Sequence, residues 1–425
     1  MTKKTLKKKL PSLTPPKRII SGWSNGIVKW HIRDATSGLY TLDIEHIPEE
    51  VVKEHNNPKS SESVLSRYRQ KICVHNCPNC FNEQERVYSK ENRILTLDET
   101  LGVVDQARDI AREEGHEFQS VKFLGPGELL MNPQLFKILE EYRIRGIQLN
   151  IFTKGAVLGS DELALKYQGM TAKGLTERLA SFQNSGILIN FQSFNDSLQD
   201  ALVTSTGENG QRQGLLEYSK IREQALENLF HSRFYMQGVT DRVCIINAPI
   251  VPENIGESFD IYKFFVERGT PVVMTPSMMS GKGCNQYKKS EVDIRAFHEQ
   301  LVDLYVAIYK FNVNKGIQTA EQIQREGIAS YVGAEPCNQA SVGLYLRANG
   351  IVQMCPGRFD KETVFGNVFE TSLREIWQAS PNRQRGIINP HNLINNSCPA
   401  KDEHGAFPKD FYERVMQRYK EGLKE

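Results

Sequence analysis

The chain has 425 residues, of which 39% are hydrophobic and 24% are charged, and its formal net charge is only +2. This composition is typical of a globular protein with a sizeable core. At about 150 residues per domain, the length allows two or three units, or one barrel with an appendage. The near-neutral charge argues against nucleic acid as a partner. No uninterrupted apolar stretch of about 20 residues occurs, so no membrane span is expected.

The chain begins with a basic run, because five of the first nine residues are lysines. Such a run can contact phosphates or an acidic partner, but a solvated, disordered tail is the interpretation we favour. No apolar segment follows it in the manner of a secretory signal. We therefore expect a cytoplasmic protein, in which the eight cysteines are metal ligands, catalytic thiols or core residues rather than disulfides.

Short apolar runs alternate with long amphipathic segments along most of the chain. After a short β element within 19–60, strands are predicted at 64–72, 121–124, 147–152, 187–192, 242–248 and 271–275. Helices are predicted near 98–114, 133–144, 161–184, 214–236, 256–268 and 290–311. This alternation predicts right-handed βαβ units and a parallel sheet. Six units are too few to close an eight-stranded barrel, so we expect a partial (β/α)6 TIM-like barrel.

The pattern changes after the last of these helices. Residues 337–400 are rich in turns, contain three cysteines and show one short helical pattern at Leu373–Ala379. A small domain of this kind often depends on a metal for its stability. We therefore predict three parts: a basic tail with a short β element at 1–63, the barrel at 64–312, and a small loop-rich domain at 313–425.

Three cysteines stand close together with the spacing C-x3-C-x2-C: Cys73, Cys77 and Cys80. Pro78 disfavours a helix here, so we expect a loop that surrounds a bound group. A structural zinc site usually has four ligands, and His75 could complete a Cys3His set. A [4Fe–4S] cluster on three thiolates, which leaves one iron open to a further ligand, is the interpretation that we favour.

This spacing at the start of a βα series resembles the signature of the radical S-adenosylmethionine (SAM) superfamily. The resemblance implies that SAM binds the open iron through its amino and carboxylate groups. Its reductive cleavage would give a 5′-deoxyadenosyl radical that abstracts a substrate hydrogen atom. A reductant such as flavodoxin or ferredoxin is implied as well. The family often has an aromatic residue just before the third cysteine; here Asn79 stands there, and Phe81 follows as the candidate for the cofactor pocket.

The segment after the second barrel strand resembles the family's "GGE" segment, which contacts the methionyl amino group of SAM. Gly125 and Gly127 would allow a close backbone approach, and Glu128 would add a negative charge for the ammonium. A simple strand-ending turn is the alternative.

Later strand ends resemble further SAM-binding positions of the family. Thr153-Lys154-Gly155 stands where Thr-Asn-Gly is common, with Lys154 as a departure. Ser193 and Asn247 are the candidates for SAM contacts on the next two strands. Asn254 suits a turn or a helix cap equally well.

Cys337, Cys355 and Cys398 fall in the turn-rich region. The first two, with Gly350, have the pattern C-x12-G-x4-C, which resembles the opening half of the SPASM/twitch extension behind many radical SAM barrels. The dense cysteine series of the full SPASM form does not follow. The resemblance therefore implies a C-terminal iron–sulfur domain of the shorter twitch form, with one auxiliary [4Fe–4S] cluster on these three cysteines. A zinc site is the alternative.

Cys284 lies in a glycine-rich loop and is the candidate catalytic cysteine. It could be the fourth ligand of the auxiliary cluster, donate a hydrogen atom to a product radical, or do neither. Cys244 lies among apolar residues of a predicted strand and is expected in the core.

The resemblance predicts an enzyme, a radical SAM oxidoreductase or transforming enzyme that modifies a peptide or protein. No winged-helix leader-binding domain is evident in 1–63, which counts against peptides. Oxidation or epimerisation of a small molecule, such as a sugar, cyclitol or nucleotide, is the alternative. A non-catalytic, zinc-stabilised binding module is the alternative of another class.

Overall fold

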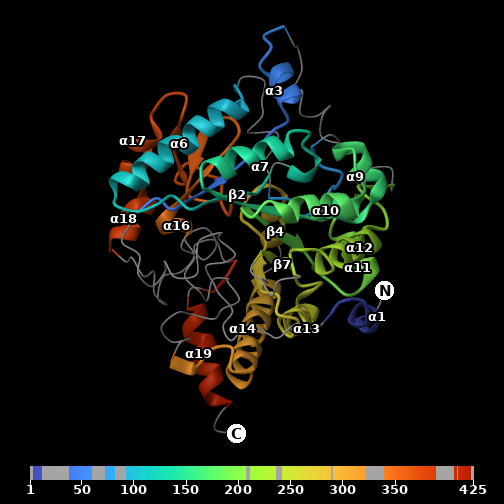
Figure 1. Ribbon diagram of the computed structural model, residues 1–425. Helices are drawn as coiled ribbons and strands as arrows, with labels where there is room; N and C mark the ends of the chain where they lie inside the picture. The colour runs from blue at the N-terminus through green and yellow to red at the C-terminus, as the bar shows by residue number, and fades with distance from the viewer. Residues whose placement is uncertain are drawn as a thin grey trace.

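The computed structural model describes residues 3–11, 38–59, 72–81, 92–125, 127–206, 211–235, 242–288, 291–321, 339–388, 406–408 and 410–422. In these residues a nine-stranded sheet has the order β11-β10-β9-β1-β2-β3-β4-β7-β8 (Figure 1). Its barrel portion consists of six parallel strands. They are β1 (Thr41–Ile44), β2 (Ser120–Phe123), β3 (Gln148–Thr153), β4 (Ser185–Asn190), β7 (Val243–Ile250) and β8 (Val272–Pro276).

Helices connect consecutive parallel strands, as the sequence predicts for βα units. They are α3 (Glu49–His55), α6 (Leu97–Glu113), α7 (Leu135–Ile144), α8 (Ala156–Gly159), α9 (Asp161–Gln168), α10 (Ala172–Ser181), α11 (Asp196–Ala201), α12 (Tyr218–Phe230) and α13 (Ile255–Val266), with α14 (Glu291–Asn314) after β8. The helix predicted at 161–184 is broken in two. Gly169 adopts a left-handed conformation that ends α9, and the Thr171 side chain then caps α10. The partial (β/α)6 barrel is thus confirmed.

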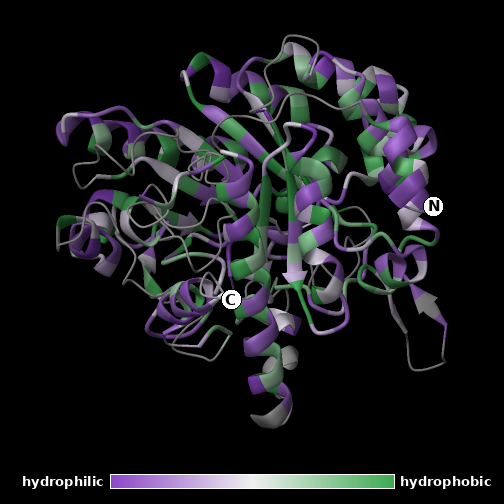
Figure 2. Ribbon diagram, turned by 90° about the horizontal axis from the view of Figure 1, so that it is seen from below, coloured by the Kyte–Doolittle hydropathy of each residue, from purple (hydrophilic) through white to green (hydrophobic). Residues whose placement is uncertain are grey.

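Side chains of the barrel strands alternate between two environments. Residues such as Leu42, Val121 and Leu149 share one large core with the surrounding helices. The alternate residues lie on the inner side, where Leu188, Cys244, Ile246 and Val273 form a separate apolar cluster on β4, β7 and β8. Figure 2 shows the apolar residues concentrated along the strands and the polar residues on the outer surfaces of the helices. Cys244 is fully buried, as expected.

The first barrel strand is β1 at Thr41–Ile44, not the stretch at 64–72 that its pattern favoured. Residues 64–71 lie outside the described residues, and residue 72 is helical. The strand β1 is short and carries the buried Asp43, so its apolar pattern is weak. In the folded protein Asp43 pairs with Lys122 of β2 at 2.7 Å, which a linear pattern cannot reveal. The three-part domain division remains a prediction, but β1 already belongs to the barrel sheet.

In the described residues, strands of the C-terminal region extend the barrel sheet. Strand β9 (Gly343–Leu346) pairs in parallel with β1, and β10 (Ile351–Gln353) and β11 (Val364–Asn367) follow in antiparallel order. These strands were not predicted, because they have only three or four residues each. The predicted helix Leu373–Ala379 is present as α17, flanked in the sequence by β11 and by α18 (Pro381–Ile388). The capping box at its start involves Ser372 and Glu375.

The N-terminal lysine run is helical, which corrects the expectation of a disordered tail. Helix α1 (Lys3–Lys9) buries Leu6, and Leu10 beyond its end is buried as well. Lys3 pairs with Asp260 of α13 at 3.0 Å, and Lys9 pairs with Glu227 of α12 at 2.8 Å. The i, i+4 spacing of the two leucines gives this segment an apolar side, which packs against the core. The lysines beside it pair with acidic residues of α12 and α13.

At the other end of the chain, α19 (Phe411–Glu421) packs along α14 (Figure 1). Arg418 of α19 pairs with Glu299 and Asp303 of α14, each at 2.6 Å. Among the helices in the described residues, none has the length and apolarity needed to cross a membrane.

Candidate functional site

The loop that contains Cys73, Cys77 and Cys80 is attached to three other segments through its backbone. The Glu128 N–H donates to the Ile72 carbonyl at 2.8 Å, and the Asn76 N–H donates to the Val203 carbonyl at 3.1 Å. The Lys282 N–H donates to the Cys80 carbonyl at 2.8 Å. Because these partners follow β2, β4 and β8, the loop lies against several carboxyl ends of the barrel strands, the usual place for a site in parallel α/β folds.

The three thiols of this loop are electrostatically linked. Burial raises the pKa of Cys73, and the neighbouring Cys77 and Cys80 raise it further. The pKa of Cys77 is also raised by burial, while Lys154 and Lys282 oppose the shift. Thiolates placed together in this way need a cation to compensate their charge, so the donor set suits metal binding.

No group of three or more His, Cys, Asp or Glu residues that could hold a metal ion occurs in the described part of the chain. His75 does not join the thiols in such a group; its ring packs edge-on against Tyr218 at 5.0 Å between centroids. In an iron–sulfur cubane each thiolate binds a different iron, so the sulfurs do not converge on one ion. The ligand roles of the three cysteines stay predictions.

Glu128 faces the cysteine loop from the end of β2, as the predicted segment requires. Gly127 makes this approach possible. It has φ of +91°, and a Cβ there would lie 2.4 Å from the Ile72 carbonyl oxygen. The carboxylate of Glu128 is buried, and its Oε2 accepts hydrogen bonds from the Thr153 hydroxyl (2.7 Å) and the Lys154 N–H (3.1 Å).

The second oxygen of Glu128, Oε1, is buried and accepts no hydrogen bond of ordinary geometry from the described residues. Burial raises the pKa of this carboxyl to about 7, although the hydrogen bonds from Thr153 and from the Lys154 and Leu130 N–H groups oppose the shift. A buried carboxylate oxygen without a strong donor suits a bound ammonium group.

Lys154 and Gln192 lie beside this carboxylate, at the ends of β3 and β4. The Lys154 ammonium donates to Gln192 Oε1 at 3.3 Å. Gln192 is fully buried, and its Nε2 has no partner among the described residues. The Lys154 backbone carbonyl accepts a hydrogen bond from the Tyr218 hydroxyl at 2.6 Å, which fixes the backbone at this point. A cation and an unpaired amide donor together suit a carboxylate group.

His75, in the middle of the cysteine loop, contributes no charge to the site. Burial and the nearby Lys154 lower its pKa to about 3, so its ring is neutral at ordinary pH. Both of its ring nitrogens are buried and lack partners among the described residues.

The donors and the acceptor of this site fit the methionyl end of SAM, which carries one ammonium and one carboxylate. Glu128 was a candidate from the sequence, whereas Lys154 and Gln192 were not singled out for this site. Lys154 was noted only as a departure from the family pattern, and Gln192 was passed over for its neighbour Ser193. Only the fold shows that Gln192 keeps a buried donor unpaired.

Ser193 and Asn247 are fully buried, and the fold uses their polar atoms. The Ser193 hydroxyl lies 3.0 Å from both carboxylate oxygens of Glu257. The Asn247 amide donates to the Phe191 carbonyl at 2.9 Å and accepts from the Ser258 hydroxyl at 2.9 Å. These contacts join β7 to the end of β4 and attach both to α13, and the predicted contacts of both residues with SAM stay predictions.

Asn254, which suited a turn or cap, has a similar fixed place. Its side chain donates to the Gln192 carbonyl (3.2 Å) and the Pro249 carbonyl (3.1 Å) and accepts from the Val251 N–H (2.8 Å). It therefore supports the backbone next to Gln192.

Phe81 and Cys284 are both near the segment that follows β8. The Phe81 carbonyl accepts a hydrogen bond from the Ser280 hydroxyl at 3.0 Å. Cys284 lies on the 3-10 helix η3 (Gly281–Lys288), whose start contacts Cys80. The roles predicted for Phe81 and Cys284, and for Gly125 after β2, stay predictions.

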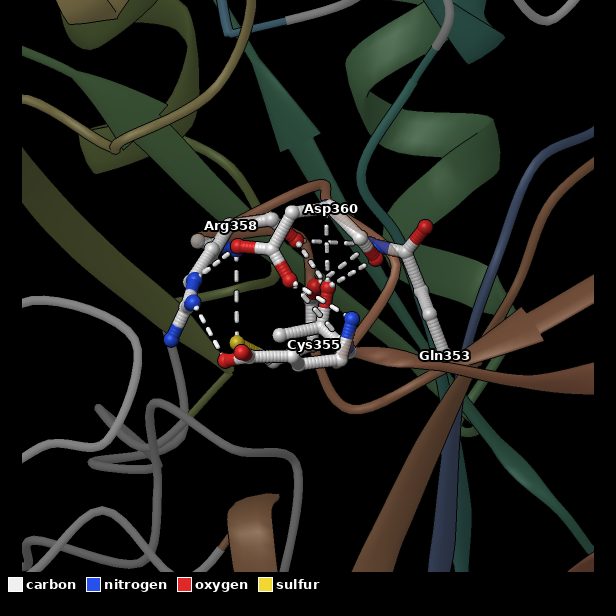
Figure 3. A network of polar contacts seen from close by, with 7 residues as sticks. Gln353, Cys355, Arg358 and Asp360 are labelled. Atoms are coloured by element: carbon white, nitrogen blue, oxygen red, sulfur yellow. Dashed lines mark hydrogen bonds and ion pairs between the residues drawn. The ribbon is translucent and has the colours of Figure 1, made fainter.

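Of the three C-terminal cysteines, only Cys355 lies within the described residues; Cys337 and Cys398 lie outside them. The Gly357 N–H points at the Cys355 sulfur at 3.3 Å. Gln353 donates to the carbonyls of Cys355 (2.7 Å) and Arg358 (3.0 Å), and Arg358 pairs with Asp360 (Figure 3). The thiol thus sits in a loop braced by its own polar network.

Comparisons with known proteins bear on the fold and on the C-terminal region. Residues 337–400 match the model of SPASM, an iron–sulfur cluster-binding domain. The chain is similar to the structure of native anSMEcpe with bound AdoMet and Cp18Cys peptide, with a TM-score of 0.53 and 15% identity over 90% of this chain and 96% of that chain. Native anSMEcpe with bound AdoMet is similar at a TM-score of 0.52, with the same identity and coverage.

A third structure, Streptococcus suis SuiB bound to precursor peptide SuiA, has a TM-score of 0.48 and 15% identity over 93% of this chain and 79% of that chain. A search of curated proteins gave no match. The domain match confirms the predicted SPASM-type extension at residues 337–400, and the likeness to anSMEcpe over 90% of the chain confirms the predicted fold.

Proposed function

We propose that this protein is a radical SAM enzyme that modifies a peptide or protein. The observation that carries the proposal is the meeting of a three-cysteine loop with an unpaired carboxylate oxygen on Glu128 and unpaired or cationic donors on Gln192 and Lys154. This donor set matches a [4Fe–4S] cluster together with a zwitterionic amino acid group. When bound, the cluster and SAM would supply one-electron chemistry that starts hydrogen-atom abstraction.

The chain's own residues bind and orient the cofactor. Cys73, Cys77 and Cys80 hold the cluster, Glu128 Oε1 accepts from the methionyl ammonium, and the donors of Lys154 and Gln192 hold the carboxylate. Glu128 and Gln192 are buried, so little water reaches these two side chains and their polar contacts are strengthened. The hydrogen bond from Thr153 to Glu128 fixes the orientation of the carboxylate.

The choice of a peptide or protein substrate rests on the structural likeness to anSMEcpe, which was solved with a bound peptide. The SPASM match supports an auxiliary cluster held by Cys337, Cys355 and Cys398. We propose one such cluster, as in the twitch form, which would accept an electron from a substrate radical or bind the substrate.

The proposal is tested by anaerobic reconstitution with iron and sulfide. Two cubane clusters give about eight irons per chain, and addition of SAM and a reductant should release 5′-deoxyadenosine. Replacing Cys73, Cys77 and Cys80 by Ala should abolish SAM cleavage. Replacing Cys337, Cys355 and Cys398 should leave some cleavage but stop modification of an added peptide library.

The matched control is Cys244→Ala, because this cysteine is buried in the apolar cluster on β4, β7 and β8. It should keep both clusters and SAM cleavage. Tight zinc in place of iron, with no SAM cleavage, would contradict the proposal. If a sugar or nucleotide, and no peptide, stimulates SAM cleavage, the proposed radical SAM activity stands and only the proposed substrate class changes.

A further inference from the structure

The segment at residues 279–282, here called the strap, touches both cysteine loops. On one side the Lys282 N–H donates to the Cys80 carbonyl at 2.8 Å. On the other side the Met279 N–H donates to the Gly357 carbonyl at 2.7 Å, two residues after Cys355. The strap follows β8 in the barrel, so one barrel segment spans the space between the two predicted cluster sites.

The side chain of Ser280 joins the two loops at a single atom. Its Oγ lies 3.0 Å from the Phe81 carbonyl and 3.0 Å from the Pro356 carbonyl. Phe81 directly follows Cys80, and Pro356 directly follows Cys355. Ser280 is fully buried, so water does not compete for its hydroxyl proton, which the two carbonyls share.

Gly281 keeps the strap in close contact with the first loop. It has φ of +54°, and a Cβ at this position would lie 2.6 Å from the Cys80 carbonyl oxygen and 2.8 Å from that of Phe81. Any larger residue must push the strap away from the first cysteine loop. The contact is therefore set by backbone packing as well as by the Ser280 hydroxyl.

Each loop also has anchors that do not involve the strap. The first loop is held by the Asn76 and Glu128 N–H groups, and the second by the Gln353 side chain. Loss of the Ser280 hydroxyl should therefore leave both loops folded. What it removes is the fixed position of one loop relative to the other.

We propose that the strap couples the two cluster sites, so that the state of the auxiliary site changes the affinity of the first site for SAM. Ser280 is the positioning residue of this coupling. The inference rests on the proposed function, because it takes the two loops as cluster sites. By linkage, SAM binding must act on the auxiliary site to the same extent.

The test is a double-mutant cycle on SAM affinity, measured by anaerobic equilibrium dialysis of the reconstituted full chain without reductant. Ser280→Ala and Cys355→Ala should each weaken SAM binding by roughly 2- to 10-fold, the range of one lost hydrogen bond. If the strap carries the coupling, the double variant should have the same SAM affinity as whichever single variant binds SAM more weakly. Fold-losses that multiply in the double variant would overturn the proposal.

A second measurement needs no cluster. In metal-free protein, hydrogen exchange at the amides of Met279 and Lys282 should be about 2- to 10-fold faster in Ser280→Ala than in the wild type. The matched control is Ser232→Ala, which removes an equally buried hydroxyl that donates to the Leu229 carbonyl at 2.7 Å. It should change neither the exchange of these amides nor SAM affinity. Unchanged hydrogen exchange at the amides of Met279 and Lys282 in Ser280→Ala would overturn the role proposed for the strap.

Gly281→Ala perturbs the same contact while keeping the hydroxyl, so it serves if Ser280→Ala folds poorly. It should weaken SAM binding in the wild-type background and weaken it less in Cys355→Ala, where only its direct clash with the first loop remains. Different results would refute the proposed function and the proposed coupling. A wild-type protein that binds neither iron nor SAM refutes the proposed function. SAM binding on which Ser280→Ala and Cys355→Ala have independent effects refutes only the coupling through the strap.

Discussion

Replacing Glu128 by Gln should weaken SAM binding and, at the same time, stabilise the cofactor-free protein. The amide keeps the shape of the carboxylate and an oxygen that can accept from Thr153 and Lys154. It loses the negative charge that Oε1 offers to an ammonium. A hydrogen bond to a charged group contributes about 1.5–3 kcal/mol, so the affinity for SAM should fall roughly 10- to 150-fold.

The pH dependence of binding gives a sharper form of this prediction. With a pKa of about 7, the Glu128 carboxyl is mostly protonated at pH 6 and mostly ionised at pH 8. Because only the ionised form attracts the ammonium, ionisation of Glu128 by itself would raise SAM affinity about tenfold over this interval. The α-amino group of SAM loses its proton near pH 8, so the observed affinity should rise by less than this, reach a maximum between about pH 7 and 8, and fall above pH 8. The rising limb should be absent in Glu128→Gln.

The effect on stability has the opposite sign. The folded pKa of about 7 lies above the model value of 4.5 for an unfolded chain. Below pH 4.5 the Glu128 carboxyl is protonated in both the folded and the unfolded state, so it does not lower the free energy of unfolding. As the pH rises to 7, this carboxyl ionises only in the unfolded state, and the free energy of unfolding decreases. At about 1.4 kcal/mol per unit, the loss approaches about 3 kcal/mol above pH 7. Glu128→Gln removes it and should be the more stable protein at pH 8.

The assays are equilibrium dialysis of SAM from pH 6 to 9 and urea unfolding of the reduced, metal-free protein at pH 5 and pH 8. The matched control is Glu375→Gln, whose carboxylate caps the distant helix α17. It should leave SAM affinity unchanged at every pH. Equal stability of wild type and Glu128→Gln at pH 8, or a rising limb that persists in the variant, would refute the role assigned to Glu128.

Two further substitutions test the barrel interior and the approach of Glu128 to the cysteine loop. Lys122→Met leaves the buried Asp43 without its cation and should cost about 3–5 kcal/mol in urea unfolding, whereas adding Asp43→Asn should recover part of that loss. Because burial already raises the pKa of Asp43, the cost should be larger at pH 8 than at pH 5; a pH-independent cost would contradict the pairing. Gly127→Ala forces a Cβ against the Ile72 carbonyl and should remove the iron of the first cluster while sparing the auxiliary iron. Full retention of the first cluster's EPR signal would show that this close packing is not needed.

Several parts of the fold could be predicted because they depend on local patterns. The strands β2, β3, β4, β7 and β8 and the helices α6, α7 and α13 lie within a few residues of their expected positions. Long apolar and amphipathic stretches of this kind carry the same signal whatever surrounds them. The short strands β9, β10 and β11 were missed, and β1, which lies within the β element expected at 19–60, was not assigned to the barrel. The stability of these strands comes from neighbours distant in the sequence.

The same division applies to charged residues. The N-terminal lysines were expected in solvent because a linear pattern cannot show that Asp260 and Glu227 lie opposite them. Lys154 was noted only as a departure from a family pattern, because its use depends on the carboxylate of Glu128 and the amide of Gln192, which come from other strands.

The sequence alone therefore supplied the expectation of iron–sulfur chemistry. The spacing of Cys73, Cys77 and Cys80 predicts a bound metal group because thiols on a short loop lie close together in any fold, and the pattern around Cys337 and Cys355 resembles the SPASM/twitch extension. Only the tertiary structure decided which polar atoms remain unpaired at the strand ends, and that the strap after β8 contacts both cysteine loops. Those facts depend on contacts between residues far apart in the chain. Burial, and not spacing in the sequence, determines which polar atoms are left without a hydrogen-bond partner.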